Sequence, residues 1–283
     1  MIKFGPSGNS EEFYNEGHKH TIEAPIWLSE RGLNAFEYPF NRGVALKDET
    51  AIALGNEFAK YGITVSVHAP YYINLAGTND ELLEKSYGYV IDSLKKLKLL
   101  GGTHCVMHPG TCGSLPREEA FSLLKERTKE LVKRVKKAGI TGVYICPETM
   151  GKSQQLGTYE EIAEICSYDD MLIPTVDFGH INALEHGSLK TPEDFERVIK
   201  CFIDKIGIEK VRHMHIHFSK IEYGEKGEIK HLTFEDTKYG PEFENLAVVL
   251  KKYNLEPMII CESRGTQAKD AKIMKEIYEN TTI

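Results

Sequence analysis

Several features that would place this sequence in a specialised class are missing. No apolar run approaches the ~18 residues that suggest a membrane-spanning helix, and no Pro-, Gly- or Ser-rich linker divides the 283 residues. The start of the chain lacks the charged-then-apolar pattern of a signal peptide. These absences disfavour a membrane protein and a string of separate modules. We therefore expect a cytoplasmic protein without membrane contacts.

Basic charge and paired cysteines are also scarce. Lys and Arg total 35 against 42 Asp and Glu, which gives a formal net charge of −7. This balance disfavours a strongly basic protein that binds nucleic acid through overall charge. The six cysteines form no Cys-x-x-Cys pair, so we interpret them as reduced structural thiols in a reducing compartment.

Eight short, β-rich apolar segments alternate with longer amphipathic stretches, as in proteins built from buried parallel strands. The segments lie at 2–5, 34–40, 63–70, 104–110, 142–149, 171–180, 211–219 and 258–265. Helical spacing is clearest over 117–139, where Gly139 would end the helix, and Asn79 and Thr191 are expected N-caps. The alternation predicts an α/β fold, a single (β/α)8 TIM barrel over residues 1–283. A doubly wound open sheet is the alternative, but no phosphate-binding Gly-rich motif follows any strand.

Polar residues at the carboxyl ends of these strands carry the functional signal. They are His68, His108, Glu148, Asp177, His180, His215 and Glu262. The carboxyl ends of barrel strands form the face where active sites are built. Burying several carboxylates there without cations would be costly, and imidazole together with carboxylate suits Zn, Mn or Fe. The set exceeds the needs of one zinc ion, so we expect two or three metal ions with Glu148 as a bridging ligand.

In their order along the chain, these residues resemble the endonuclease IV family of apurinic/apyrimidinic endonucleases, within the xylose isomerase-like barrels. The segments that carry the resemblance are HAPYYINL at 68–75, HPG at 108–110, ETMGKSQQLGT at 148–158, DFGH at 177–180, MHIHFSK at 214–220 and CES at 261–263. The resemblance covers nearly the whole chain. It implies a Zn²⁺ enzyme, with Mn²⁺ or Fe²⁺ as alternatives, that acts on damaged double-stranded DNA. We expect a monomer.

The resemblance implies a role for each metal-ligating position. His68, His108 and Glu148 would hold a first zinc ion. Glu148, Asp177, His215 and Glu262 would hold a second, and His180 and His231 a third. Glu148 and Glu262 would be the catalytic residues, with Glu262 orienting or deprotonating the attacking water.

Contacts with DNA are expected from loops on the same face. Tyr71 matches a residue that contacts the DNA opened at an abasic site, and Arg42 would stand in for a DNA-penetrating loop that has no clear match here. Lys152, Lys220 and Arg264 are candidates for phosphate contacts, which fix the position of DNA without reading its sequence.

Besides that loop, two further positions depart from the family pattern. The third zinc site of the family uses an Asp-x-His pair, whereas Ile229 stands two residues before His231 here, so Glu228 or Lys230 could take the place of the aspartate. The family's Asn-Asp after the seventh-strand histidine is replaced by His217 and Phe218. By strand alternation His217 faces the same way as His215, so it could be a substitute ligand or a hydrogen-bonding neighbour of one.

The resemblance implies hydrolysis of the phosphodiester bond 5′ to abasic sites in DNA base-excision repair, through a metal-activated hydroxide on a di- or trinuclear zinc-type cluster. An abasic nucleotide has lost its pairing and stacking, so opening the duplex there costs less. The alternative is a single-metal sugar isomerase or epimerase, in which two glutamates move protons beside a carbonyl. The additional His68, His108 and His180 favour the nuclease. A metal-binding paralogue without catalytic activity is a third interpretation.

Overall fold

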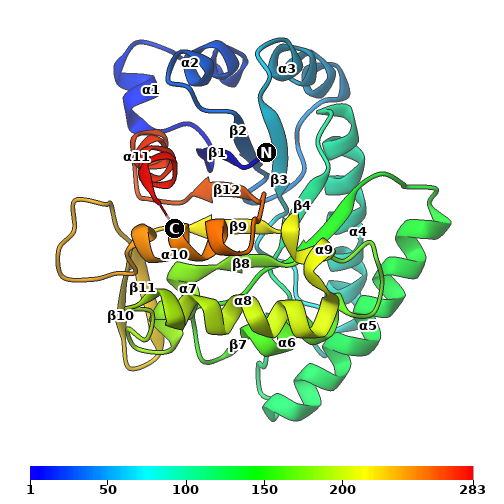
Figure 1. The fold of residues 1–283 in the computed structure, drawn as a ribbon. Helices are drawn as coiled ribbons and strands as arrows, with labels where there is room; N and C mark the ends of the chain where they lie inside the picture. Colours follow the sequence, from blue (N-terminus) through cyan, green and yellow to red (C-terminus); the bar gives the residue numbers. More distant parts are fainter. Residues whose placement is uncertain (283) are drawn as a thin grey trace.

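Eight parallel strands form a closed barrel in the computed structural model, which describes residues 1–282 (Figure 1). The barrel strands are β1 (Lys3–Pro6), β2 (Ala35–Pro39), β3 (Thr64–His68), β4 (His104–Met107), β6 (Tyr144–Pro147), β8 (Thr175–Asp177), β9 (His215–Phe218) and β12 (Met258–Cys261). They pair in two four-stranded sheets, β1-β12-β9-β8 and β2-β3-β4-β6. Parallel bridges from Ser7 to Glu37 and from Glu148 to Thr175 join the sheets at both seams. The predicted barrel is confirmed, and the open sheet is excluded.

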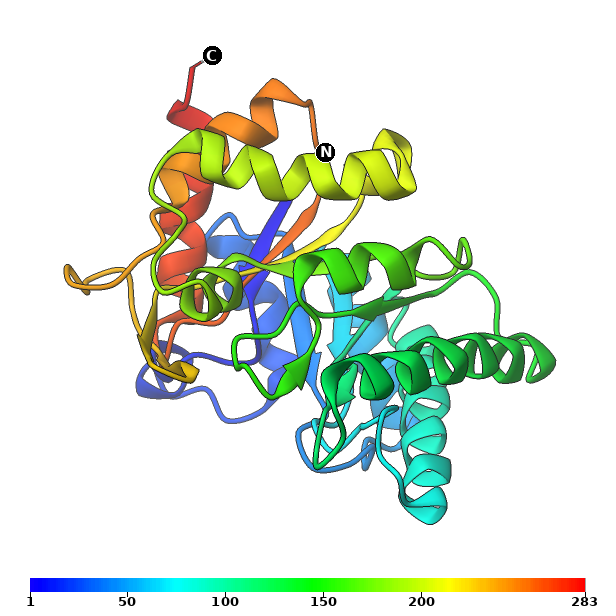
Figure 2. The ribbon, with the colours of Figure 1, turned by 90° about the horizontal axis from the view of Figure 1, so that it is seen from below.

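Helices surround the strands (Figures 1 and 2). They are α1 (Glu11–Asn15), α2 (Ala24–Glu30), α3 (Asp48–Lys60), α4 (Asp80–Leu99), α5 (Arg117–Lys137), α6 (Tyr159–Cys166), α7 (Phe178–Leu184), α8 (Pro192–Ile206), α9 (Ile208–Arg212), α10 (Phe243–Lys252) and α11 (Gln267–Asn280), with a 3-10 turn, η1 (Thr21–Glu23). Their apolar faces and the outer faces of the strands make one continuous core. Within residues 1–282, none of the helices combines the length and apolar character that crossing a bilayer requires.

Local sequence signals set several helix ends as predicted. The Asn79 side chain accepts a hydrogen bond from the Leu82 amide at 3.0 Å where α4 begins. Thr191 forms a capping box in front of α8, and Pro192 is the first residue of that helix. Helix α5 ends at Lys137, and Gly139 follows with φ +68°, a conformation that glycine adopts without strain.

Two small antiparallel strand pairs build up the rim at the carboxyl end of the barrel. Strand β5 (Gly110–Thr111) pairs with β7 (Gln155–Leu156), and β10 (Ile221–Gly224) forms a hairpin with β11 (Gly227–His231). This hairpin packs closely on the loop after β6, because a Cβ atom at Gly227 would lie 2.1 Å from the carbonyl oxygen of Gly151. The amide of Glu228 donates to that same carbonyl at 2.9 Å. This contact brings β11 to the mouth of the barrel.

Candidate metal centre

Imidazoles and carboxylates from several strand ends converge on a cavity at the mouth of the barrel. The cavity has a volume of about 270 Å³. Its titratable lining residues include His68, His108, Glu148, Lys152, His180, Glu228, His231 and Glu262. At the mouth, these side chains and the buried Asp177 and His217 form three groups, in each of which the ligand atoms lie within 4.8 Å of one another.

The first group consists of His68, His108 and Glu148. The Nε2 atoms of His68 and His108 lie 3.3 and 3.2 Å from Oε2 of Glu148. The other ring nitrogen of His68, Nδ1, donates to the carbonyl of Ala69 at 2.8 Å. That hydrogen bond fixes the ring so that Nε2 faces the carboxylate, as in metal-ligating histidines.

The second group consists of Glu148, Asp177, His217 and Glu262. His217 Nδ1 lies 2.9 Å from Oε1 of Glu148 and 3.6 Å from Oε1 of Glu262. Glu148 therefore belongs to two groups, with Oε2 facing one and Oε1 facing the other. This is the geometry that a bridging carboxylate requires.

The structure does not bring His215 into the second group, which corrects the assignment suggested by the sequence. Strand register is the reason: β8 and β9 pair Asp177 with His217, and Thr175 with His215. His215 points into the barrel like His217, but it lies two residues deeper. There its Nε2 atom is 2.9 Å from Oε2 of Glu37.

The third group consists of His180, Glu228 and His231. His180 Nε2 is 3.6 Å from Glu228 Oε2, and His231 Nε2 is 3.9 Å from Glu228 Oε1. Both rings are held from behind, since Nδ1 of His180 lies 2.9 Å from the Thr149 carbonyl and Nδ1 of His231 lies 2.8 Å from the Ser219 hydroxyl. Of the two alternatives to the family's aspartate, Glu228 therefore occupies the position beside the two histidines.

The electrostatics of the mouth fit a cation site. Burial raises the pKa of Asp177, and although His180 opposes this effect, the carboxylates of Glu262 and Glu148 add to it. Its Oδ2 atom is buried without a hydrogen-bond partner among the described residues. Burial lowers the pKa of His68, but Glu148 outweighs burial and raises it to about 9. Protons on the imidazoles thus offset the negative charge of the carboxylates, and a bound metal ion would displace these protons. The oxygen and nitrogen donors suit Zn, Mn or Fe.

Four of the five residues expected to contact DNA lie around the mouth. Tyr71, 46% exposed, and Lys152 line the cavity, and Lys152 Nζ is 3.8 Å from Oε2 of Glu228. A hydrogen bond to Tyr71 raises the pKa of the exposed Arg42. The exposed Arg264 lines a neighbouring hollow with His231.

Lys220 does not belong with them. Its side chain is 8% exposed, and its ammonium group lies 2.9 Å from Oε1 of Glu242 and donates to the Asp236 carbonyl at 2.8 Å. The lysine holds the segment between β11 and α10, and the structure does not place its ammonium group among the exposed cations around the mouth.

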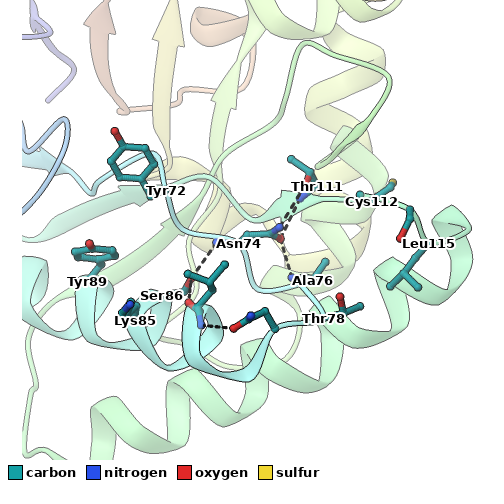
Figure 3. Close-up of a pocket in the computed structure, with 15 residues that line it drawn as sticks. Tyr72, Asn74, Ala76, Thr78, Lys85, Ser86, Tyr89, Thr111, Cys112 and Leu115 are labelled. Carbon is teal, nitrogen blue, oxygen red and sulfur yellow. Dashed lines mark hydrogen bonds between the residues drawn. The ribbon is translucent and has the colours of Figure 1, made fainter.

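A larger hollow of about 700 Å³ lies beside the mouth, between the loops after β3 and β4 and the start of α4 (Figure 3). Hydrogen bonds around the Asn74 side chain hold these loops together, since its Oδ1 atom accepts from the amides of Ala76 and Thr111. Its lining carries one charged side chain, Lys85, which is paired with Glu81. This hollow offers no set of converging ligands, so the metal chemistry belongs to the smaller cavity.

Sequence reasoning missed Glu37. This carboxylate is fully buried in β2 and forms a fourth group with His215 and His217. The available signal was a lone acidic residue inside the apolar segment 34–40, because a charge in a buried strand needs partners.

Comparisons with known proteins agree with this architecture. A family model described as "Xylose isomerase-like TIM barrel" matches residues 26–279. The uncharacterized protein MJ0133 of Methanocaldococcus jannaschii is 30% identical over 277 residues, covering 97% of this chain and 96% of that protein. A probable endonuclease 4 of Staphylococcus carnosus is 27% identical over 221 residues, 72% of each chain.

Two solved structures show how widely the fold is shared. Endonuclease IV from Thermus thermophilus superposes with a TM-score of 0.69 at 19% identity, covering 99% of this chain and all of that one. D-Psicose 3-epimerase from Clostridium cellulolyticum superposes with a TM-score of 0.66 at 15% identity, covering 99% and 93%. At these identities both likenesses establish the fold alone.

Proposed function

The chain belongs to the xylose isomerase-like TIM barrel family, and we propose that within it the chain is a metal-dependent endonuclease that cleaves DNA 5′ to abasic sites. The observation that carries the proposal is the number of ligand groups at the mouth. Three groups share one cavity, and Glu148 belongs to two of them. A two- or three-metal site of this kind suits phosphodiester hydrolysis, since it stabilises both the attacking and the leaving oxygen.

The chain's own residues have separable roles in this proposal. His68 and His108 would hold an ion with Glu148; Asp177, His217 and Glu262 would hold another; and His180, Glu228 and His231 a third. The bound ions would supply Lewis acidity, which lowers the pKa of water and offsets the charge of the phosphate. Glu262 is 18% exposed at the edge of the cavity, where its carboxylate can orient the attacking water and accept its proton.

DNA would lie across the rim, because the cavity itself is too small for a duplex. Tyr71 and Arg42 stand on one side of the mouth, and Lys152 and Arg264 stand near hairpin β10–β11. This local placement of cations allows phosphate contacts in a chain whose net charge is −7. Relatives named probable endonuclease 4, at 27% identity, support the same substrate class.

A sugar isomerase or epimerase is the second candidate. Glu148, Asp177, His217 and Glu262 alone make a four-ligand site for one metal, and an epimerase of known structure has the same fold. Proton transfer beside a sugar carbonyl does not require the first or third ligand group. Their presence favours the nuclease.

The deciding experiment is incision of a duplex oligonucleotide that carries one tetrahydrofuran abasic analogue. The analogue cannot break by β-elimination, so a product with a 3′-hydroxyl end requires hydrolysis. We expect cleavage 5′ to the analogue, its loss after prolonged chelation, its return with Zn²⁺, and no cleavage of the undamaged duplex. If folded, metal-replete protein did not incise this duplex but did epimerise a ketose, the second candidate would be established instead.

A further inference from the structure

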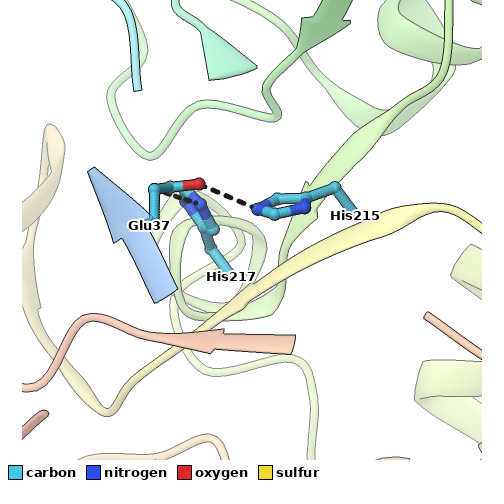
Figure 4. A group of neighbouring side chains, drawn as sticks. All are labelled: Glu37, His215 and His217. Carbon is cyan, nitrogen blue, oxygen red and sulfur yellow. Dashed lines mark hydrogen bonds and ion pairs between the residues drawn. The ribbon is translucent and has the colours of Figure 1, made fainter. Parts of the chain in front are cut away.

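Directly beneath the metal centre, and sharing His217 with it, three buried side chains form a further polar cluster: Glu37 on β2 and His215 and His217 on β9 (Figure 4). The solvent exposure of each side chain is 0%. A buried carboxylate is costly unless donors surround it. The arrangement of donors around Glu37 therefore indicates what this residue does.

The two oxygens of Glu37 are used differently. Oε2 accepts from the Ser66 hydroxyl at 2.9 Å and lies 2.9 Å from Nε2 of His215. These two partners fix the carboxylate from β3 and β9. Among residues 1–282, Oε1 has no such partner, and it lies 3.0 Å from Nε2 of His217.

Oε1 of Glu37 and Nε2 of His217 are each other's available hydrogen-bond partners. Among the described residues, neither atom has a well-aligned hydrogen-bond partner, and each is the other's neighbour at hydrogen-bond distance. The opposite ring nitrogen, Nδ1, already faces Glu148 and Glu262.

We propose that Glu37 is a positioning residue for the metal centre: it accepts the Nε2–H of His217, which leaves the Nδ1 lone pair for a cation beside Glu148, Asp177 and Glu262. The inference rests on the metal centre of the proposed function. Carboxylates that orient ligating histidines in this way raise metal affinity. His215 has the supporting role, since it holds the other oxygen of Glu37. In the His-x-His pattern of β9, His217 is thus the metal ligand, and His215 holds Glu37, which in turn orients His217.

The cluster is not itself a site for another metal ion in this arrangement. Oε2 of Glu37 already receives two donors at 2.9 Å. A cation bound by Glu37 and His217 would have to replace the Nε2–H of His217. The fate of that single proton therefore separates the two interpretations.

The test follows the imidazole N–H protons of His217 by NMR in the full-length protein with ¹⁵N-labelled histidine, before and after loading with Zn²⁺. Assignment uses His217→Gln. We expect an exchange-protected Nε2–H of His217 in both states, and loss of its Nδ1–H on zinc loading. Loss of Nε2–H on zinc loading, or an Nε2–H that exchanges freely in both states, would overturn the proposal.

Variants supply a second readout that does not depend on turnover. Glu37→Gln should weaken one zinc ion by about 10- to 100-fold in competition with a chromophoric chelator. Zinc held by His180, Glu228 and His231 should keep its affinity. Ser66→Ala is the matched control: it removes one donor to Oε2, leaves Oε1 in place, and should change affinity by no more than a few-fold. Wild-type affinity in folded Glu37→Gln would contradict the proposal.

The outcomes separate this inference from the proposed function. Protein that binds zinc with the expected protons but does not incise abasic DNA refutes the nuclease and supports the role of Glu37. Incision of abasic DNA by the wild type, together with normal zinc affinity of Glu37→Gln, would support the nuclease and refute the role of Glu37. If the wild-type protein bound none of Zn²⁺, Mn²⁺ and Fe²⁺, both would fail.

Discussion

The Nε2 atom of His180 lies 3.6 Å from the Oε2 atom of Glu228, although one residue belongs to helix α7 and the other to strand β11. Glu228 reaches this position because its hairpin is anchored to the Gly151 carbonyl. Its neighbour Ile229 points outward and is 57% exposed. The geometry therefore places the carboxylate of the third ligand group at position 228 and leaves the side chain of position 229 outside that group.

Glu228→Gln should lower the metal content by about one ion per chain, since the two remaining histidines are too few ligands to retain zinc. Elemental analysis of the purified protein would measure this change. Glu222→Gln is the matched control, because Glu222 lies in the same hairpin and pairs with Lys230 at 3.0 Å. An unchanged metal content in folded Glu228→Gln would show that the carboxylate at position 228 is not a ligand.

Glu148→Gln should abolish metal-dependent incision and reduce metal binding at the same time. The amide keeps the shape of the side chain but cannot bridge two cations with anionic oxygens. Changing the partners of metal ligands alone costs roughly 10- to 100-fold, so loss of a shared ligand should exceed about 100-fold in the rate of incision. Glu130→Gln, on the outer helix α5, should incise normally. Full activity of Glu148→Gln would refute the bridging role.

Much of this architecture could be predicted from the sequence, because strand alternation and strand-end positions are local properties. They locate the barrel and bring His68, His108, Glu148 and Asp177 to the same mouth. Depth along a strand is not a local property. His215 and His217 share a face, and only the register of β9 against β8 shows that His217 is level with Asp177.

The remaining differences have the same origin in long-range contacts. The anchoring of Glu228 depends on Gly151, and the burial of Lys220 depends on Glu242. Neither contact leaves a periodic signal in the sequence. Glu37 was visible only as a charge in an apolar strand, and its partners come from β3 and β9.

Removal of metal ions held by these groups should destabilise the protein, because such ions would bind the folded chain in preference to the unfolded one. A ligand at 1,000 times its Kd adds about 4 kcal/mol to the free energy of unfolding. For a chain of this size, that corresponds to a decrease in Tm of roughly 10 °C on chelation. Differential scanning calorimetry with and without chelator would measure it.

Asp177→Asn tests whether the buried charge of Asp177 adds to the instability of the metal-free protein. In the chelated protein the variant should have a higher Tm than the wild type, because burial and neighbouring carboxylates disfavour a charge at Asp177. The asparagine oxygen can still cap α7, as Asp177 Oδ1 does for the His180 amide at 2.7 Å. With zinc bound the order of Tm values should reverse. A lower Tm for the variant in both states would assign Asp177 a purely structural role.

Lys152 tests the side of the mouth that the DNA backbone would follow. Its side chain is 49% exposed at the rim, beside Glu228. If its ammonium group contacts a phosphate, Lys152→Gln should weaken binding to abasic duplexes of any flanking sequence. The slope of log affinity against log salt should become shallower by about 1, as expected for loss of one released counterion.

Two control variants show how far the salt dependence changes when a lysine away from the expected DNA contact is replaced. Lys133→Gln changes a 78%-exposed lysine near the end of helix α5, which leads back to the start of β6 and so away from the mouth, and it should leave the slope unchanged. Lys220→Gln removes an ammonium group paired with Glu242, so it should lower Tm and leave the slope unchanged. Fluorescence anisotropy titrations at several salt concentrations, with chelator present to prevent incision, would compare all three variants. Equal slopes for Lys152→Gln and the wild type would place the DNA backbone away from hairpin β10–β11.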